Sequence, residues 1–159
     1  MERVFDGHND VLLRLWRGRA NGVDPVAEFV DGTTEGHIDG PRAKAGGLAG
    51  GLGAINIPSD GDFSLKEPDA DGHYHTPLEA PLQRQSSLDI ALDMASIALR
   101  LDRAGGWRLC RSTGEIRNAM DDGVFAAVMH MEGCVPTGLI ASSVNGCPRG
   151  TAPPTTMRS

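Results

Sequence analysis

The stretch "STGEIRNAMDDGVFAAVMHMEG", Ser112 to Gly133, combines a capped helix with a buried strand that follows it at once. Ser112 stands three residues before Glu115, which is the spacing of a capping box, and Gly123 is a typical stop after a helix. The next run, Val124 to Met129, is almost wholly apolar, which predicts a strand buried on both faces. A helix that leads directly into such a strand is typical of α/β folds with parallel strands.

The same alternation of helix and strand extends toward the N-terminus. A helix is predicted from Ser86 to the pair Gly105-Gly106, because apolar residues recur along it every three to four positions: Leu88, Leu92, Ala95 and Leu99. Two further strands are predicted before it, at Val4-Phe5 and from Leu52 to Pro58, and the apolar run Val11 to Trp16 predicts a short helix between them. We therefore expect roughly three parallel strands joined by helices.

Four other segments predict irregular structure. Residues 17–40 are polar and contain glycine, which favours a surface excursion, and the glycine-rich residues 45–53 favour a flexible loop. Residues 59–81 are rich in acids, glycine and proline and are predicted to be an inserted loop. Residues 135–159 are more than half Pro, Gly, Ser and Thr and lack any sustained periodicity. The predicted organisation is one unit over residues 1–134, followed by an irregular tail.

Composition and charge exclude several classes of function. The chain has 159 residues, of which 40% are apolar and 23% charged, as in a globular domain. Its formal net charge of −6 argues against nucleic acid or an anionic membrane as the main partner, because both need a basic face. Cys110, Cys134 and Cys147 form no C-x-x-C pair, which favours a reducing compartment. Without a signal-like N-terminus or a membrane-spanning apolar run, the expected location is the cytoplasm.

Two pairs of polar side chains stand directly after predicted strands. His8 and Asp10 are two residues apart, so an extended segment presents both to one face, and zinc accepts imidazole nitrogen and carboxylate oxygen. His130 and Glu132 follow the strand that starts at Val124. Active sites of parallel α/β barrels are assembled at the carboxyl ends of strands. We therefore treat His8, Asp10 and Glu132 as candidate metal ligands, the alternative being polar residues that only emerge into solvent.

Other motifs carry weaker signals. Spacing alone is poor evidence, because a second His-x-Asp match occurs at His37 and Asp39. His73 and His75 stand among acids in the inserted loop, where solvated side chains are expected rather than a metal-binding pair. The H-x-E pair that begins at His130 lacks the P-C-x-x-C of zinc deaminases, which excludes that class. No motif supports a serine or thiol nucleophile, and no catalytic or substrate-binding residue is assigned.

Three motifs together point to a known family. In order and spacing, "FDGHND", "HIDGPRAKAGGLAGGLGAINIP" and "EIRNAMDDGVFAAVMHMEGC" resemble the zinc-dependent membrane dipeptidase (renal dipeptidase) family of amidohydrolase-like TIM barrels. The resemblance covers about residues 3–134. It implies that His8 and Asp10 bind one zinc ion and that Glu132 bridges two. It further implies that a metal-bridging hydroxide attacks the peptide bond of a dipeptide.

The chain also departs from the family. Members take later histidines, an arginine and an aspartate from strands after the bridging glutamate, but here no histidine follows His130. About three strands cannot close a barrel that needs eight, so an incomplete (β/α)8 TIM barrel with open sheet edges is expected. We hypothesise that a frameshift near Cys134 replaced the family's continuation with the tail, and a naturally truncated copy is the alternative.

Three functional interpretations follow from the residues and the resemblance. The preferred one is a zinc dipeptidase that carries only part of its site and is inactive in isolation. The second is a non-catalytic or degenerate half-barrel that binds a partner, for example through its open sheet edge. The third is a metal enzyme that completes its site across a homodimer, so a homo-oligomer is compatible with the sequence.

Overall fold

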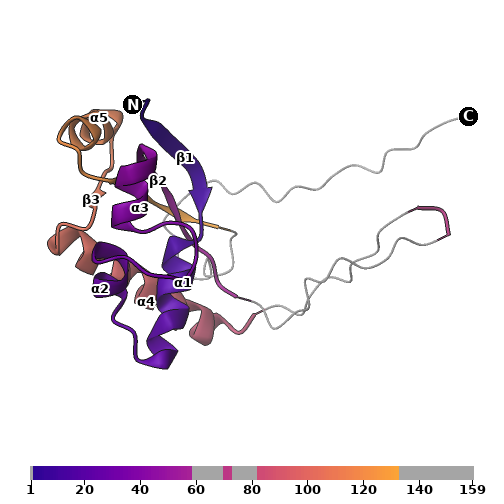
Figure 1. The fold of residues 1–159 in the computed structure, drawn as a ribbon. Helices are drawn as coiled ribbons and strands as arrows, with labels where there is room; N and C mark the ends of the chain where they lie inside the picture. Colours follow the sequence, from indigo (N-terminus) through magenta and orange to yellow (C-terminus); the bar gives the residue numbers. More distant parts are fainter. Residues whose placement is uncertain (1, 59–69, 73–81, 133–159) are drawn as a thin grey trace, which may run out of the picture.

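The computed structural model describes residues 2–58, 70–72 and 82–132 (Figure 1). The elements are β1 (Val4–Asn9), α1 (Val11–Gly18), a 3₁₀ turn (Arg19–Asn21), α2 (Pro25–Val30), α3 (Gly40–Gly46), β2 (Leu48–Ile55), α4 (Arg84–Arg103), β3 (Arg108–Leu109), α5 (Thr113–Asp121) and β4 (Ala126–Met131). All strands lie parallel in one sheet, in the order β1-β2-β4-β3. The predicted α/β class is confirmed. Most of the predicted inserted loop and the whole tail lie outside the described residues.

The three predicted strands are present, but their ends are shifted. β1 continues beyond Phe5 to Asn9, β2 begins at Leu48 instead of Leu52, and β4 runs to Met131. The fourth strand, β3, was not predicted, because two residues are too few to show a periodic pattern. It pairs only with Ala126 and Ala127 at the beginning of β4.

The glycine-rich residues 45–53 do not form the predicted flexible loop. From Leu48 onward they belong to β2, which pairs with β1 on one side and with β4 on the other. A Cβ atom on Gly50 would lie 2.4 Å from the carbonyl oxygen of Ala126 and 3.0 Å from the ring of Phe5. The glycines are therefore explained by close approach of neighbouring strands rather than by flexibility.

Replacing Gly50 by alanine is expected to lower the free energy of unfolding by about 1–3 kcal/mol, as overpacking of a filled interior does. The obstacle is a backbone atom of β4, which cannot turn aside as a side chain could. Gly46→Ala is the matched control, because a Cβ atom added there, at the end of α3, would have nothing within 4 Å. Urea denaturation should show a lower midpoint for Gly50→Ala alone, and equal midpoints for the two variants would contradict this packing.

One face of the sheet is covered by α1, α2 and α4, whose apolar side chains form the main core. α4 is the longest helix with 20 residues, and among the described residues no helix is long and apolar enough to cross a membrane. Its buried face differs from the predicted one, since Leu92 and Leu99 are 59% and 41% exposed. The buried residues are Ser87, Ala91, Met94, Ile97, Ala98 and Leu101. Both stripes have helical spacing, and the buried one, which includes Ala91 and Ala98, belongs to the main core.

Residues 17–40 are not simply the predicted surface excursion, because they contain α2. Asp24 caps this helix by accepting a hydrogen bond from the Val26 amide, and Pro25 stands at its first turn. Phe29 is fully buried, with its ring 5.5 Å from that of Trp107 and 6.0 Å from that of Phe125, both measured between centroids. This short helix therefore supplies an aromatic anchor to the core.

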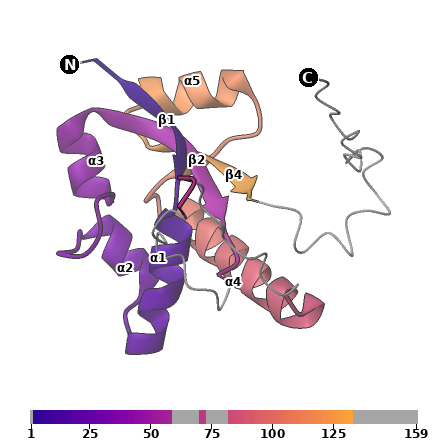
Figure 2. The ribbon, with the colours of Figure 1, turned by 90° about the vertical axis from the view of Figure 1, so that its right-hand side faces the viewer.

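The opposite face of the sheet is covered by α5 (Figure 2). Ala127 belongs to the main core, whereas its neighbour Ala126 packs with Cys110 and Ala119 in a second cluster. Alternate residues of a strand point to opposite faces, so the two alanines place β4 between two helical layers. The predicted cap of α5 is confirmed, since the Ser112 hydroxyl accepts a hydrogen bond from the Glu115 amide at 3.2 Å.

Candidate metal centre

The end of β1 supplies two of the candidate ligands. His8 lies within β1, and Asp10 follows the strand and precedes α1. Asp10 occupies the N-cap position of α1, but its side chain makes no capping hydrogen bond. Its carboxylate therefore remains available to other groups at this edge of the sheet.

The end of β4 supplies the third candidate ligand. The Glu132 amide donates a hydrogen bond to the carbonyl oxygen of Ile55 at 3.2 Å, which extends the pairing of β2 and β4 by one step beyond the strand. Because all strands are parallel, their carboxyl ends meet at the same edge of the sheet. Glu132 is thereby brought beside His8 and Asp10 from a distant part of the sequence.

The three side chains form a group with the dimensions of a metal site. The Nε2 atom of His8 lies 3.7 Å from Oδ1 of Asp10 and 3.7 Å from Oε2 of Glu132, and one ligand atom from each residue lies within 4.8 Å of the others. Zinc bonds of about 2.0–2.2 Å in a tetrahedral arrangement place ligand atoms about 3.4 Å apart. One nitrogen and two oxygens at these separations fit zinc after small side-chain movements.

The candidate site is open to solvent. The side chains of His8, Asp10 and Glu132 are 43%, 51% and 45% exposed. An ion could therefore enter directly from water. Three protein ligands leave further coordination positions for water, substrate or additional side chains.

Two neighbouring residues lie close to this group without belonging to it. The ring of His130 meets that of His8 edge-on, with centroids 6.1 Å apart. The Nδ2 atom of Asn56, directly after β2, donates a hydrogen bond to Oδ1 of Asp10 at 3.4 Å. Sequence reasoning missed Asn56, because the strand predicted from Leu52 to Pro58 contained it, whereas β2 ends at Ile55 and leaves Asn56 directly after the strand.

The second His-x-Asp match has a different role. Asp39 is buried and caps α3, accepting hydrogen bonds from the Arg42 amide at 2.8 Å and the Thr33 amide at 3.2 Å. Burial alone would raise the pKa of Asp39, but these amides and the Arg42 guanidinium outweigh it and hold the pKa below its usual value. His37 and Asp39 are therefore not in the metal group. His73 and His75 lie outside the described residues.

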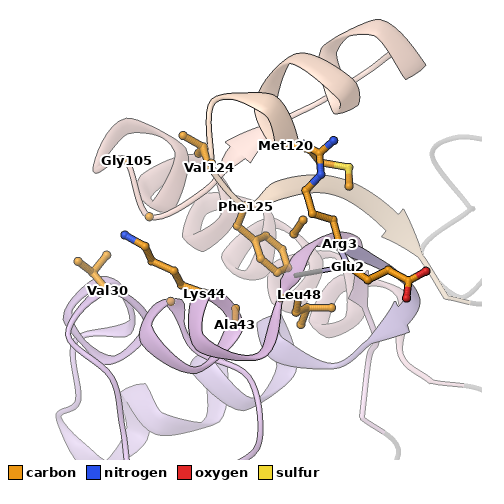
Figure 3. A pocket seen from close by; sticks show the side chains of 15 residues that line it. Glu2, Arg3, Val30, Ala43, Lys44, Leu48, Gly105, Met120, Val124 and Phe125 are labelled. Atoms are coloured by element: carbon orange, nitrogen blue, oxygen red, sulfur yellow. The ribbon is translucent and has the colours of Figure 1, made fainter.

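A cavity of about 440 Å³ lies at the opposite end of the sheet (Figure 3). It is bordered by the amino ends of β1, β2 and β4 and by residues that include Arg3, Lys44, Leu48, Met120 and Phe125. None of the three candidate ligands lines it. The cavity and the candidate metal centre are therefore separate features.

The solved structures similar to this fold include two metallopeptidases. A metallopeptidase of family M19, the dipeptidase AC, is 38% identical with a TM-score of 0.72, over 84% of this chain and 38% of that one. The resemblance to the membrane dipeptidase family, M19, is confirmed. A metallopeptidase from Rhodobacter sphaeroides, solved with a phosphinate mimic of the dipeptide L-Ala-D-Ala, is 36% identical with a TM-score of 0.70, over 84% of this chain and 39% of that one.

The match to M19 concerns the N-terminal portion of the family. An uncharacterized protein in the PQQ-III 3′ region of Acinetobacter calcoaceticus is 30% identical over 131 residues, which are 82% of this chain and 40% of that protein. No family model matches the chain. The chain thus spans about two fifths of the length of these relatives, and its parallel sheet matches a fragment of an M19 barrel.

Proposed function

We propose that this chain is the N-terminal part of a zinc-dependent dipeptidase, and that His8, Asp10 and Glu132 are its share of the metal site. The observation that carries the proposal is the convergence of these three ligand atoms within 4.8 Å at the carboxyl ends of β1 and β4. Such an edge is where parallel α/β barrels assemble their active sites. The similarity to M19 metallopeptidases supports the same chemistry.

Each residue has a distinct part in the proposed site. His8 offers its Nε2 atom, and Asp10 and Glu132 offer carboxylate oxygens, so the group carries two negative charges toward a divalent cation. Asn56 donates to Asp10 and restricts the direction of that carboxylate. When bound, zinc supplies Lewis-acid activation of water and of the scissile carbonyl.

The proposed substrate class is dipeptides. One similar structure is called a dipeptidase, and the other was solved with a mimic of L-Ala-D-Ala. The exposed position of the three ligands leaves room for a small substrate above the edge of the sheet. In this proposal, residues outside the described ranges or in another chain would complete the coordination of the metal and hold the free ends of the substrate.

A chimera tests this function. Residues 2–132 of this chain would replace the matching segment of the R. sphaeroides metallopeptidase, and zinc-dependent hydrolysis of L-Ala-D-Ala would be measured. We expect hydrolysis well above background, and loss of it in the same chimera carrying Glu132→Ala. A folded, zinc-containing chimera that hydrolyses nothing would overturn the proposal.

The alternative of a non-catalytic binding module has one observation in its favour. Leu92 and Leu99 on α4 and Met129 and Met131 on β4 are four of the seven large apolar residues exposed in the described part of the chain. A partner that brings a helix or a strand could cover the exposed apolar side chains of α4 or of β4. In the chimera, a binding module would give a folded protein without hydrolysis.

A further inference from the structure

β1 contains a bulge immediately before the candidate metal centre. Asp6 is paired with Gly51 of β2, and Asn9 is paired with Gly53. Three steps along β1 therefore match two steps along β2, so β1 holds one extra residue in the segment of Gly7 and His8. A bulge re-aims a side chain of the strand that contains it. Here that side chain is the one of His8, which lies within the bulge.

The side chain of Asp6 holds this bulge in place. Its Oδ1 atom accepts a hydrogen bond from the backbone amide of His8 at 3.3 Å, and its Oδ2 atom accepts one from Nδ2 of Asn9 at 3.1 Å. Asn9 is only 8% exposed and is one of three buried polar residues in the described part of the chain. The Asp6 carboxylate therefore ties together the residues on both sides of the bulge.

β2 leaves room for this pair of side chains. A Cβ atom on Gly51 would lie 2.9 Å from Nδ2 of Asn9 and 3.1 Å from Cβ of Asp6. Glycine at this position allows the two side chains to pack against the backbone of the neighbouring strand. The bulge, the hydrogen bonds and the glycine thus form one structural unit.

We propose that Asp6 and Asn9 are positioning residues that fix the bulge of β1, so that His8 and Asp10 are aimed at Glu132. This inference rests on the proposed metal site and deepens it. Neither Asp6 nor Asn9 belongs to the three-residue metal group. They act through the backbone, because Asp6 holds the His8 amide and Asn9 stands between the two ligands.

Exchanging the side chains of Asp6 and Asn9 distinguishes a positioning role from an effect of their charge alone. Asparagine has one oxygen where aspartate has two, so Asp6→Asn loses one of the two hydrogen bonds whichever way it turns. Asn9→Asp places a second carboxylate beside that of Asp6 and removes the hydrogen bond that the Asn9 amide donates to it. In the double variant, the new asparagine can accept from the His8 amide and donate to the new aspartate, which restores both bonds.

The test is calorimetric titration of the full 159-residue chain with zinc, together with circular dichroism of every variant. Both single variants should bind zinc about 10–100-fold more weakly, the range for residues that orient metal ligands, and the double variant should recover wild-type affinity. Asp31→Asn, at an exposed site beyond α2, is the charge-matched control and should bind as the wild type does.

The outcomes distinguish this inference from the proposed function. If charge near the ion alone set the affinity, Asn9→Asp would bind zinc more tightly, which would overturn the positioning role. Weak binding by the double variant with an unchanged circular dichroism spectrum would overturn it as well. A wild-type chain that binds no zinc would instead contradict the proposed metal site itself.

Discussion

The Phe29→Ala variant is expected to lose about 3–5 kcal/mol of the free energy of unfolding. The side chain of Phe29 is fully buried, and its ring packs edge-on against Trp107 and Phe125. Aromatic pairs of this geometry contribute about 0.5–1.5 kcal/mol beyond the area that they bury. The cavity left by the truncation would lie between α2 and the rings of Trp107 and Phe125, which precede β3 and β4.

Val23→Ala provides the control for this prediction. Val23 is 42% exposed and precedes the same helix, so its truncation should change the free energy of unfolding by no more than about 0.5 kcal/mol. Urea denaturation followed by tryptophan fluorescence would report both variants, because Trp107 is a neighbour of Phe29. Similar losses in the two variants would show that α2 is not anchored in the core as described.

Replacing one proposed metal ligand is expected to weaken zinc binding at least about 100-fold, more than the loss of a residue that only orients a ligand. His8→Ala removes the nitrogen, and Glu132→Ala removes the carboxylate that β4 contributes. Both side chains are exposed, so the substitutions should leave the circular dichroism spectrum and the unfolding midpoint nearly unchanged. Titration calorimetry of the three proteins would measure the effect.

The matched control for the ligand variants is His37→Ala. His37 belongs to the other His-x-Asp match, whose aspartate caps α3 and lies outside the metal group. The His37→Ala variant should therefore bind zinc with wild-type affinity. Equal weakening in His8→Ala and His37→Ala would indicate scattered surface binding by histidines instead of one site.

Local signals in the sequence predicted the elements that are bounded by a capping residue or by a glycine that ends a helix. The cap at Ser112 and the stop at Gly123 placed α5, and the apolar run after Gly123 placed β4. The same reasoning failed for β2, because glycines that indicate a loop in isolation are here required by the close approach of Ala126. It also failed for the buried face of α4, because two neighbouring stripes share the helical period and only the tertiary fold decides between them.

The sequence predicted which three side chains gather at this edge of the sheet, but not the residues that hold them in place. Position after a strand identified His8, Asp10 and Glu132, since parallel strands must end at a common edge. The bulge that redirects His8 depends on the register between β1 and β2, which the sequence of β1 alone does not contain. Asp6 and Asn9 therefore acquire their roles only once β2 is in place.

Anomalous diffraction at the zinc edge, from crystals of the full chain grown with zinc, tests the central claim most directly. The account predicts a peak bonded to Nε2 of His8 and to carboxylate oxygens of Asp10 and Glu132, at distances of about 2.0–2.2 Å. A zinc peak at other histidines, with none among these three side chains, would contradict it.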